Sequence, residues 1–153
     1  MIEVGRKAPA FTLPSSEGGT VSLSDFPGKK VVLYFYPKDN TPGCTVEACD
    51  FRDSFTHIQA AGAVVLGISA DSIASHEKFR DRFALPFPLL SDESHAMMEA
   101  YGVWKERKNY GRTYMGIERT TVLVDGEGIV RRIWPKVTVK GHVDAVLAAL
   151  TEA

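Results

Sequence analysis

The alternation of two hydrophobic periods constrains the fold of this chain more than any other feature. Short runs rich in β-branched and aromatic residues, such as Val31 to Tyr36 and Val64 to Ser69, are typical of buried strands. Between them, apolar residues recur at spacings of four, three, four and three, as on one face of a helix. That face consists of Cys44, Ala48, Phe51, Phe55 and Ile58. Strand and helix patterns that alternate in this way favour an α/β domain with a central sheet.

The remaining patterns extend this order to both ends of the chain. Phe11 to Leu13 and Thr20 to Leu23 flank the turn segment PSSEGG and predict an N-terminal hairpin. Thr121 to Val124 and Ile129 to Trp134 predict two more strands, joined by a turn at 125–128. Three further helices are predicted from the N-cap candidates Asp71 or Ser72, from Ser94 with an end at Gly102, and from the apolar face of Val143, Val146, Leu147 and Leu150.

The segment from Gly102 to Glu118 breaks this pattern. It contains the basic stretch WKERKNYGRTYMG, for which we expect an irregular loop. A loop of this length usually has a structural or functional reason.

Length and charge limit the possible functions. A chain of 153 residues can bury one sizeable core, so a single domain over residues 1–153 is predicted. The net charge is −1 and like charges form no block, which argues against nucleic acid or an anionic membrane as a partner. The opening MIEVGRKAPAF has no apolar leader, and the apolar stretch Ala60 to Ala70 is too short to span a bilayer. A cytoplasmic location is expected.

Cys44 and Cys49 are the only cysteines of the sequence. In a reducing compartment such a pair favours catalysis, redox sensing or inert burial over a permanent disulfide, and no further Cys or His stands at the spacing of a zinc site. In an intact helix their Cα atoms would lie roughly 8.7 Å apart and point about 140° away from each other. Because a disulfide needs Cα atoms within about 7 Å, the pair cannot bond unless the helix unwinds.

Cys44 stands where the helix is expected to begin, after the turn-forming residues 40–43. The unpaired N–H groups of a helix N-terminus favour an anion, so the thiolate of Cys44 is expected to be stabilised. Full ionisation at neutral pH raises the reactive fraction of a thiol only about thirtyfold. A fast reaction with a demanding oxidant therefore requires hydrogen-bond donors aimed at the reacting atoms.

Pro37, Thr41 and Cys44 form the pattern P-x-x-x-T-x-x-C, which resembles the active-site signature of the peroxiredoxins. The longer stretch YPKDNTPGCTVEACDFRD resembles the bacterioferritin-comigratory or peroxiredoxin Q subfamily. Similar stretches continue in GRKAPAFTLP, FPLLSD, YGVW and YGRTYMGIERTTVLVDGEGIV, so the resemblance covers essentially the whole chain. It implies a thioredoxin-like fold, with a central mixed sheet between helices and an N-terminal hairpin added, and it implies no cofactor.

The same resemblance implies an antioxidant peroxidase that reduces hydrogen peroxide and organic hydroperoxides. Cys44 would be the peroxidatic nucleophile that becomes a sulfenic acid. Cys49 would resolve it to an intramolecular disulfide, which thioredoxin or a similar dithiol reduces. Thr41 would hydrogen-bond the peroxide, Pro37 would shield the sulfur from water, and Arg119 would hold the thiolate and polarise the O–O bond. Since both thiols lie in one chain, a monomer is the simplest expectation.

The other polar residues are expected to be structural. Glu47 suits the dipole of the first helical turn. Each of the four histidines is expected to be an ordinary surface or core residue; they are His57, His76, His95 and His142. The basic residues of 102–118 are expected to form a solvated face, with docking of an acidic reductase as the alternative.

Two other functions stay open. A thioredoxin-class thiol–disulfide oxidoreductase would share the α/β pattern, but the chain has no C-x-x-C, and Arg119 and Thr120 stand where thioredoxins carry a proline. A non-catalytic redox sensor would use Cys44 only to register oxidant. Steady turnover of peroxide distinguishes the enzyme from the sensor.

Overall fold

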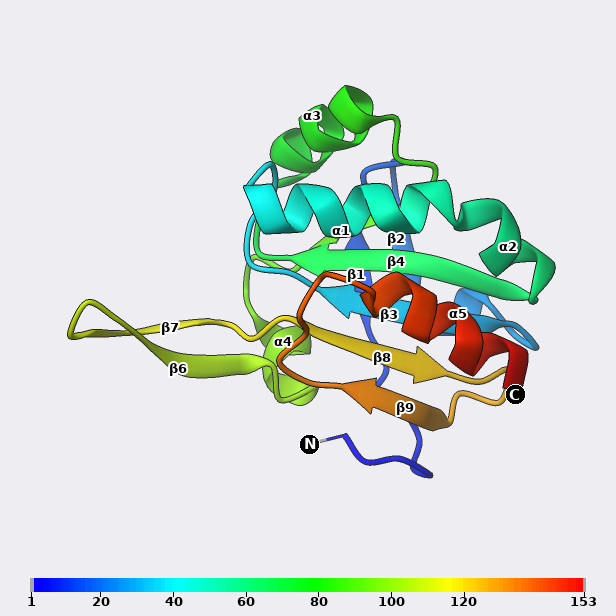
Figure 1. Cartoon of the computed structure of the whole chain (residues 1–153). Helices are drawn as coiled ribbons and strands as arrows, with labels where there is room; N and C mark the ends of the chain where they lie inside the picture. The colour runs from blue at the N-terminus through cyan, green and yellow to red at the C-terminus, as the bar shows by residue number, and fades with distance from the viewer. Residues whose placement is uncertain (1, 153) are drawn as a thin grey trace.

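The computed structural model describes residues 2–152, which are built around a five-stranded sheet (Figure 1). The strands lie in the order β5-β4-β3-β8-β9. Their bounds are β3 Lys30–Phe35, β4 Ala63–Ser69, β5 Leu89–Ser91, β8 Thr120–Val124 and β9 Val130–Trp134. Strands β3, β4 and β5 run parallel, whereas β8 is antiparallel to both β3 and β9, which confirms the predicted mixed sheet.

Helices cover both faces of the sheet. Their bounds are α1 Pro42–Asp53, α2 Phe55–Ala60, α3 Ile73–Phe83, α4 Ala96–Ala100 and α5 His142–Glu152. Side chains of α1, α2, α3 and α5 share one apolar core on one face, and α4 packs with the N-terminal segment in a second core on the other. None of the helices within residues 2–152 is both long and apolar enough to cross a bilayer.

The central strand β3 contributes side chains to both cores. Val32 and Tyr34 belong to the core beneath α1, and Val31, Leu33 and Phe35 belong to the opposite one. Because side chains alternate along a strand and both faces are covered, the run is apolar throughout rather than alternating. The end of β3 therefore has a rigid base on both sides, and the turn that leads to α1 starts from it.

The predicted helix from Cys44 to Ile58 is two helices in the structure. The first begins at Pro42, and the chain leaves the helix at Ser54 before α2 starts. Ile58 of α2 nevertheless packs in the same core as Phe51 of α1. Tertiary packing thus keeps the predicted apolar face while the backbone bends.

The expectation of an irregular loop between Gly102 and Glu118 was wrong. Strands β6 (Trp104–Asn109) and β7 (Arg112–Ile117) pair antiparallel through a two-residue turn at Tyr110 and Gly111. Both turn residues have positive φ, 50° and 75°, as a tight hairpin turn requires. Figure 1 shows that this hairpin projects from the body of the protein. Because solvent surrounds both of its faces, its sequence lacks the apolar alternation that marks a half-buried strand.

The N-terminal hairpin is confirmed. Strand β1 (Thr12–Pro14) pairs antiparallel with β2 (Thr20–Ser22), and a short 3₁₀ helix, η1 (Leu23–Asp25), follows. Leu13 of β1 and Val21 of β2 pack against the core that contains α4.

Candidate active site

The site lies at the start of α1, directly after the end of β3. Thr41 is the N-cap with extended backbone, Pro42 is the first helical residue, and Cys44 is the third. Proline suits the first helical position because its missing N–H would have no partner there. The sequence placed the helix start at Cys44; the actual start brings Cys44 into the first turn, among N–H groups without partners within the helix. Its side chain is buried, with an exposed fraction of 1%.

Arg119 joins this helix to the segment just before β8. Its Nη2 donates to Cys44 Sγ at 3.2 Å, and its Nη1 donates to Glu47 Oε1 at 2.6 Å. A Cβ on Gly43 would lie only 3.2 Å from Arg119 Nη2, so glycine gives the guanidinium room to approach. The planar fork therefore spans two side chains on the same face of α1.

Glu47 is the residue whose importance the sequence underestimated. It is fully buried and takes part in the ion pair with Arg119. Burial raises its pKa from 4.5 to about 7, although the charge and hydrogen bonds of Arg119 lower it. Its second oxygen, Oε2, is buried without a hydrogen-bond partner among residues 2–152. The available signal was its position three residues after Cys44, which places both on one helix face.

The charges around Arg119 favour a thiolate. Burial lowers the pKa of Arg119, but Glu47 and Cys44 outweigh this and leave it raised. A guanidinium that stays charged at 3.2 Å from Cys44 Sγ stabilises a negative sulfur. The arrangement can therefore hold a nucleophilic thiolate in a site with little access for water.

The structure places the other predicted site residues differently. Pro37 is exposed and lines, with Arg119, a hollow of about 560 Å³ between the site and the β6–β7 hairpin. The hydroxyl of Thr41 donates to the carbonyl of Lys38 at 2.8 Å rather than pointing to Cys44. Cys49 is half-buried within the intact α1, and both cysteines are free.

Two of the four histidines are buried and hydrogen-bonded. His142 Nε2 lies 2.8 Å from the hydroxyl of Thr121, and burial, assisted by the charge of Arg119, lowers its pKa to about 4. His76 bonds to Asp39 and to a main-chain carbonyl. His142 is therefore neutral at physiological pH and adds no charge beside the site.

Glu47 predicts a pH dependence of stability. Its folded pKa is above its unfolded pKa, so the stability that the protonated carboxyl contributes is present below about pH 4.5 and is lost as the pH rises through about 7. The difference amounts to about 3 kcal/mol. Glu47→Gln should remove this loss, so urea unfolding at pH 5 and pH 7.5 should give the variant the flatter profile. Glu99→Gln, at an exposed position of α4, is the control; parallel profiles for Glu47→Gln and the wild type would contradict the prediction.

Comparison with known proteins relates this geometry to a family. The model of the AhpC/TSA family matches residues 4–133. A putative peroxiredoxin bcp of Coxiella burnetii is 56% identical over 97% of this chain and 99% of its own length. The peroxiredoxin Bcp of Bacillus subtilis is 53% identical over 99% of this chain and 96% of its own.

A solved structure of similar fold is that of the Xanthomonas campestris bacterioferritin comigratory protein, described for its alkyl peroxide reduction activity. It has a TM-score of 0.91 and 43% identity, covering 99% of this chain and 97% of that one. The thioredoxin-like fold is thereby confirmed. The chain belongs to the AhpC/TSA family, as a peroxiredoxin of the bacterioferritin-comigratory or peroxiredoxin Q subfamily.

Proposed function

We propose that this chain, acting as a single domain over residues 1–153, reduces hydroperoxides in the cytoplasm through the thiolate of Cys44. The observation that carries the proposal is the Arg119 guanidinium, which donates to Cys44 Sγ at 3.2 Å and to Glu47 at 2.6 Å at the start of α1. The alkyl peroxide reduction described for the Xanthomonas campestris protein supports the reaction class.

In the first step, the Cys44 thiolate attacks the terminal oxygen of the hydroperoxide. A sulfur–oxygen bond forms, the O–O bond breaks, and the leaving oxygen takes a proton to depart as an alcohol or as water. Arg119 is aimed at the reacting atoms and can stabilise the charge that moves to the leaving oxygen. Thr41, once its hydroxyl turns from Lys38, and the main-chain N–H of Cys44 are the other donors; Pro37 borders the entrance.

In the second step, the Cys49 thiolate attacks the sulfenic sulfur of Cys44; a disulfide bond forms, the sulfur–oxygen bond breaks, and the leaving hydroxide takes a proton from solvent to depart as water. The two residues lie on one intact helix, where ideal geometry separates their Cα atoms by roughly 8.7 Å. Local unwinding of α1 is therefore part of the cycle. A dithiol such as that of thioredoxin then reduces the exposed disulfide and returns both thiols.

The β6–β7 hairpin of this chain offers a suitable docking surface for the protein that supplies this dithiol. Residues 104–117 hold four of the 18 basic and one of the 19 acidic residues, so the hairpin carries +3 and the rest of the chain −4. The hairpin also presents three large apolar side chains to solvent, Tyr110, Tyr114 and Met115. Aromatic, Met and basic side chains beside an active site favour docking of an acidic protein dithiol.

The two cysteines predict different failures. Cys44→Ser should abolish peroxide consumption, because no other thiol has the Arg119 contact. Cys49→Ser should keep one fast oxidation of Cys44 but lose thioredoxin-supported turnover. NADPH consumption with thioredoxin and thioredoxin reductase measures both. Turnover that survives Cys44→Ser would refute the assignment, and turnover unchanged by Cys49→Ser would make the protein a one-cysteine enzyme.

Arg119→Ala should slow the oxidation of Cys44 by far more than the roughly thirtyfold that ionisation of a thiol can provide at neutral pH. The reason is that Arg119 also acts on the transition state, where charge develops on oxygen. Single-turnover oxidation by H₂O₂, followed by rapid quenching and thiol labelling, measures the rate. A loss within thirtyfold would reduce Arg119 to an aid to ionisation.

The hairpin predicts a salt-dependent reduction step. Lys108→Gln/Arg112→Gln should lower kcat/KM for an acidic thioredoxin roughly five- to tenfold at low salt, and the difference should vanish near 1 M salt. Lys7→Gln/Lys29→Gln removes two exposed cations at the opposite end of the sheet and is the matched control. Equal losses in the two double variants would show that the hairpin has no specific role.

A further inference from the structure

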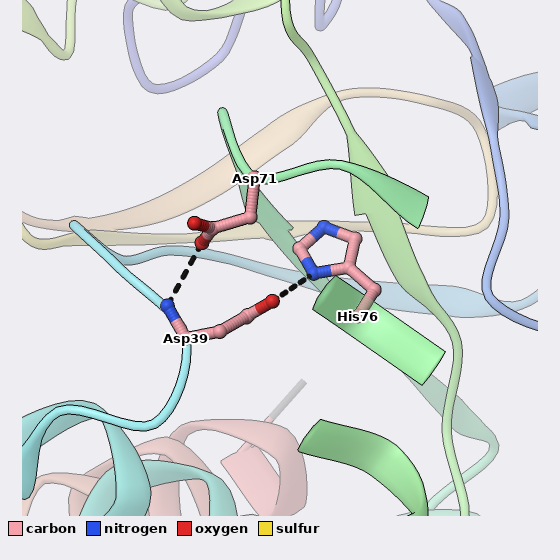
Figure 2. A group of neighbouring side chains, drawn as sticks. All are labelled: Asp39, Asp71 and His76. Atoms are coloured by element: carbon pink, nitrogen blue, oxygen red, sulfur yellow. Dashed lines mark hydrogen bonds and ion pairs between the residues drawn. The ribbon is translucent and has the colours of Figure 1, made fainter. Parts of the chain in front are cut away.

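A buried polar cluster lies beneath the turn that carries Pro37 and Thr41 (Figure 2). His76, fully buried on α3, places Nδ1 2.7 Å from Asp39 Oδ2, and its Nε2 lies 2.9 Å from the carbonyl of Leu90. Ser75 donates to the same Asp39 oxygen at 2.8 Å, and Tyr36 donates to the other at 2.6 Å. Both side-chain oxygens of Asp39 are thus occupied.

The main chain of the turn is held as well. The N–H of Asp39 donates to Asp71 Oδ2 at 2.8 Å, and the hydroxyl of Ser69 donates to that same oxygen at 2.7 Å. Next in sequence, Asn40 has a positive φ of 62° and accepts a hydrogen bond from Arg82 of α3. The turn at 37–41 is therefore tied to the ends of β4 and β5 and to the start of α3, where the carboxyl ends of parallel strands meet.

The bond between His76 and Asp39 requires a shared proton. A main-chain carbonyl only accepts, so His76 Nε2 must donate to Leu90. The other ring nitrogen faces a carboxylate oxygen, and two acceptors cannot bond without a proton between them. Nδ1 of His76 and Oδ2 of Asp39 therefore form a hydrogen bond through one proton that lies between them.

Asp39, Asp71 and His76 also offer ligand atoms within 4.8 Å of one another, a spacing that a metal ion could use. The hydrogen bonds explain the cluster without an ion. A metal on His76 Nδ1 would displace the shared proton and break the 2.7 Å bond to Asp39. Serine and tyrosine hydroxyls already occupy the remaining lone pairs of Asp39 that face the cluster.

We propose that Asp39 and His76 are positioning residues that hold the 37–41 turn in place while α1 unwinds. The proposal rests on the proposed function, because it concerns the peroxide step and the disulfide step of that cycle. Pro37 of this turn lines the hollow beside Arg119, Thr41 is the N-cap of α1, and α1 begins at the next residue. Displacement of such a turn lowers the rate of a reaction that depends on alignment.

The pair also sets where unwinding starts. Asp39 is anchored to α3 by the bonds of its side chain to Ser75 and His76, and its N–H is anchored to Asp71, which follows β4. The first turn of α1 follows Thr41. Arg119 holds this turn through its hydrogen bond to the sulfur of Cys44. Oxidation of Cys44 removes the negative sulfur that favours this bond. The helix can then unwind from residue 42 onward. Thr41 keeps its N-cap position, from which the helix can form again.

The test compares two serines at the start of α3. Ser75→Ala deletes a hydroxyl that donates to Asp39, whereas Ser72→Ala deletes the N-cap hydroxyl that accepts from the N–H of Ser75. His76→Gln removes the imidazole itself. Each change is measured for Cys44 oxidation by H₂O₂ in a Cys49→Ser background, for the rate of disulfide formation with Cys49 present, and for amide exchange of residues 38–42.

We expect His76→Gln to slow Cys44 oxidation roughly tenfold and Ser75→Ala about threefold, with no slower disulfide formation and faster amide exchange at 38–42. Ser72→Ala should stay within about twofold of its parent, since the hydroxyl of Ser72 accepts from the N–H of Ser75 and does not bond to Asp39. Equal effects of the two serine variants would overturn the proposal. So would a parallel loss in both chemical steps, or stoichiometric Zn²⁺ binding that Asp39→Asn abolishes.

The outcome for the proposed function is separate. If H₂O₂ fails to oxidise Cys44 in the parent protein, the peroxidase assignment fails. Amide exchange still decides the role of the pair in that case, and unchanged exchange at 38–42 in His76→Gln would overturn it. If the parent reacts rapidly and His76→Gln reacts equally fast, the positioning role alone is refuted.

Discussion

The contact of Arg119 with Cys44 is the interaction on which the rest of the site depends. It joins the start of α1 to the segment before β8, and the same guanidinium also holds Glu47. Cys44 and Glu47 are three residues apart, so they lie on one face only while α1 is helical. Only then can both contact the guanidinium of Arg119. Nucleophile, donor and helix therefore form one unit that assembles or comes apart together.

This dependence explains how one short helix serves two opposite demands. In the proposed cycle, attack on peroxide requires a fixed sulfur among aligned donors, whereas disulfide formation requires that sulfur to leave them. The first turns of α1 are suited to local opening, since Val46 is about half exposed and Cys49 is only half-buried. The flanks are firmer: Phe51 is fully buried beneath the helix, and Asp39 anchors the turn before it.

The sequence allowed the sheet, the N-terminal hairpin and the start of the site to be predicted, because these follow from local period and turn chemistry. Val31 to Tyr36 reads as a buried strand since both of its faces are covered. The β6–β7 hairpin was missed because solvent on both sides leaves no apolar alternation along it. The ion pair of Glu47 could not be predicted, since the burial of Glu47 depends on packing from distant segments and its partner Arg119 is 72 residues away. The cluster around His76 was missed for the same reason: Asp39 follows β3, Asp71 follows β4 and His76 lies on α3, so they meet only in the folded chain (Figure 2).

The helix that carries both cysteines must open before they can bond. Amide hydrogen exchange of residues 42–50, together with mapping of thiols after one equivalent of H₂O₂, tests it most directly. We expect protected amides in the reduced protein, and an intrachain Cys44–Cys49 disulfide with protection lost over this segment after oxidation. A disulfide between these residues with α1 still protected, or oxidation that leaves no bond between them, would contradict it.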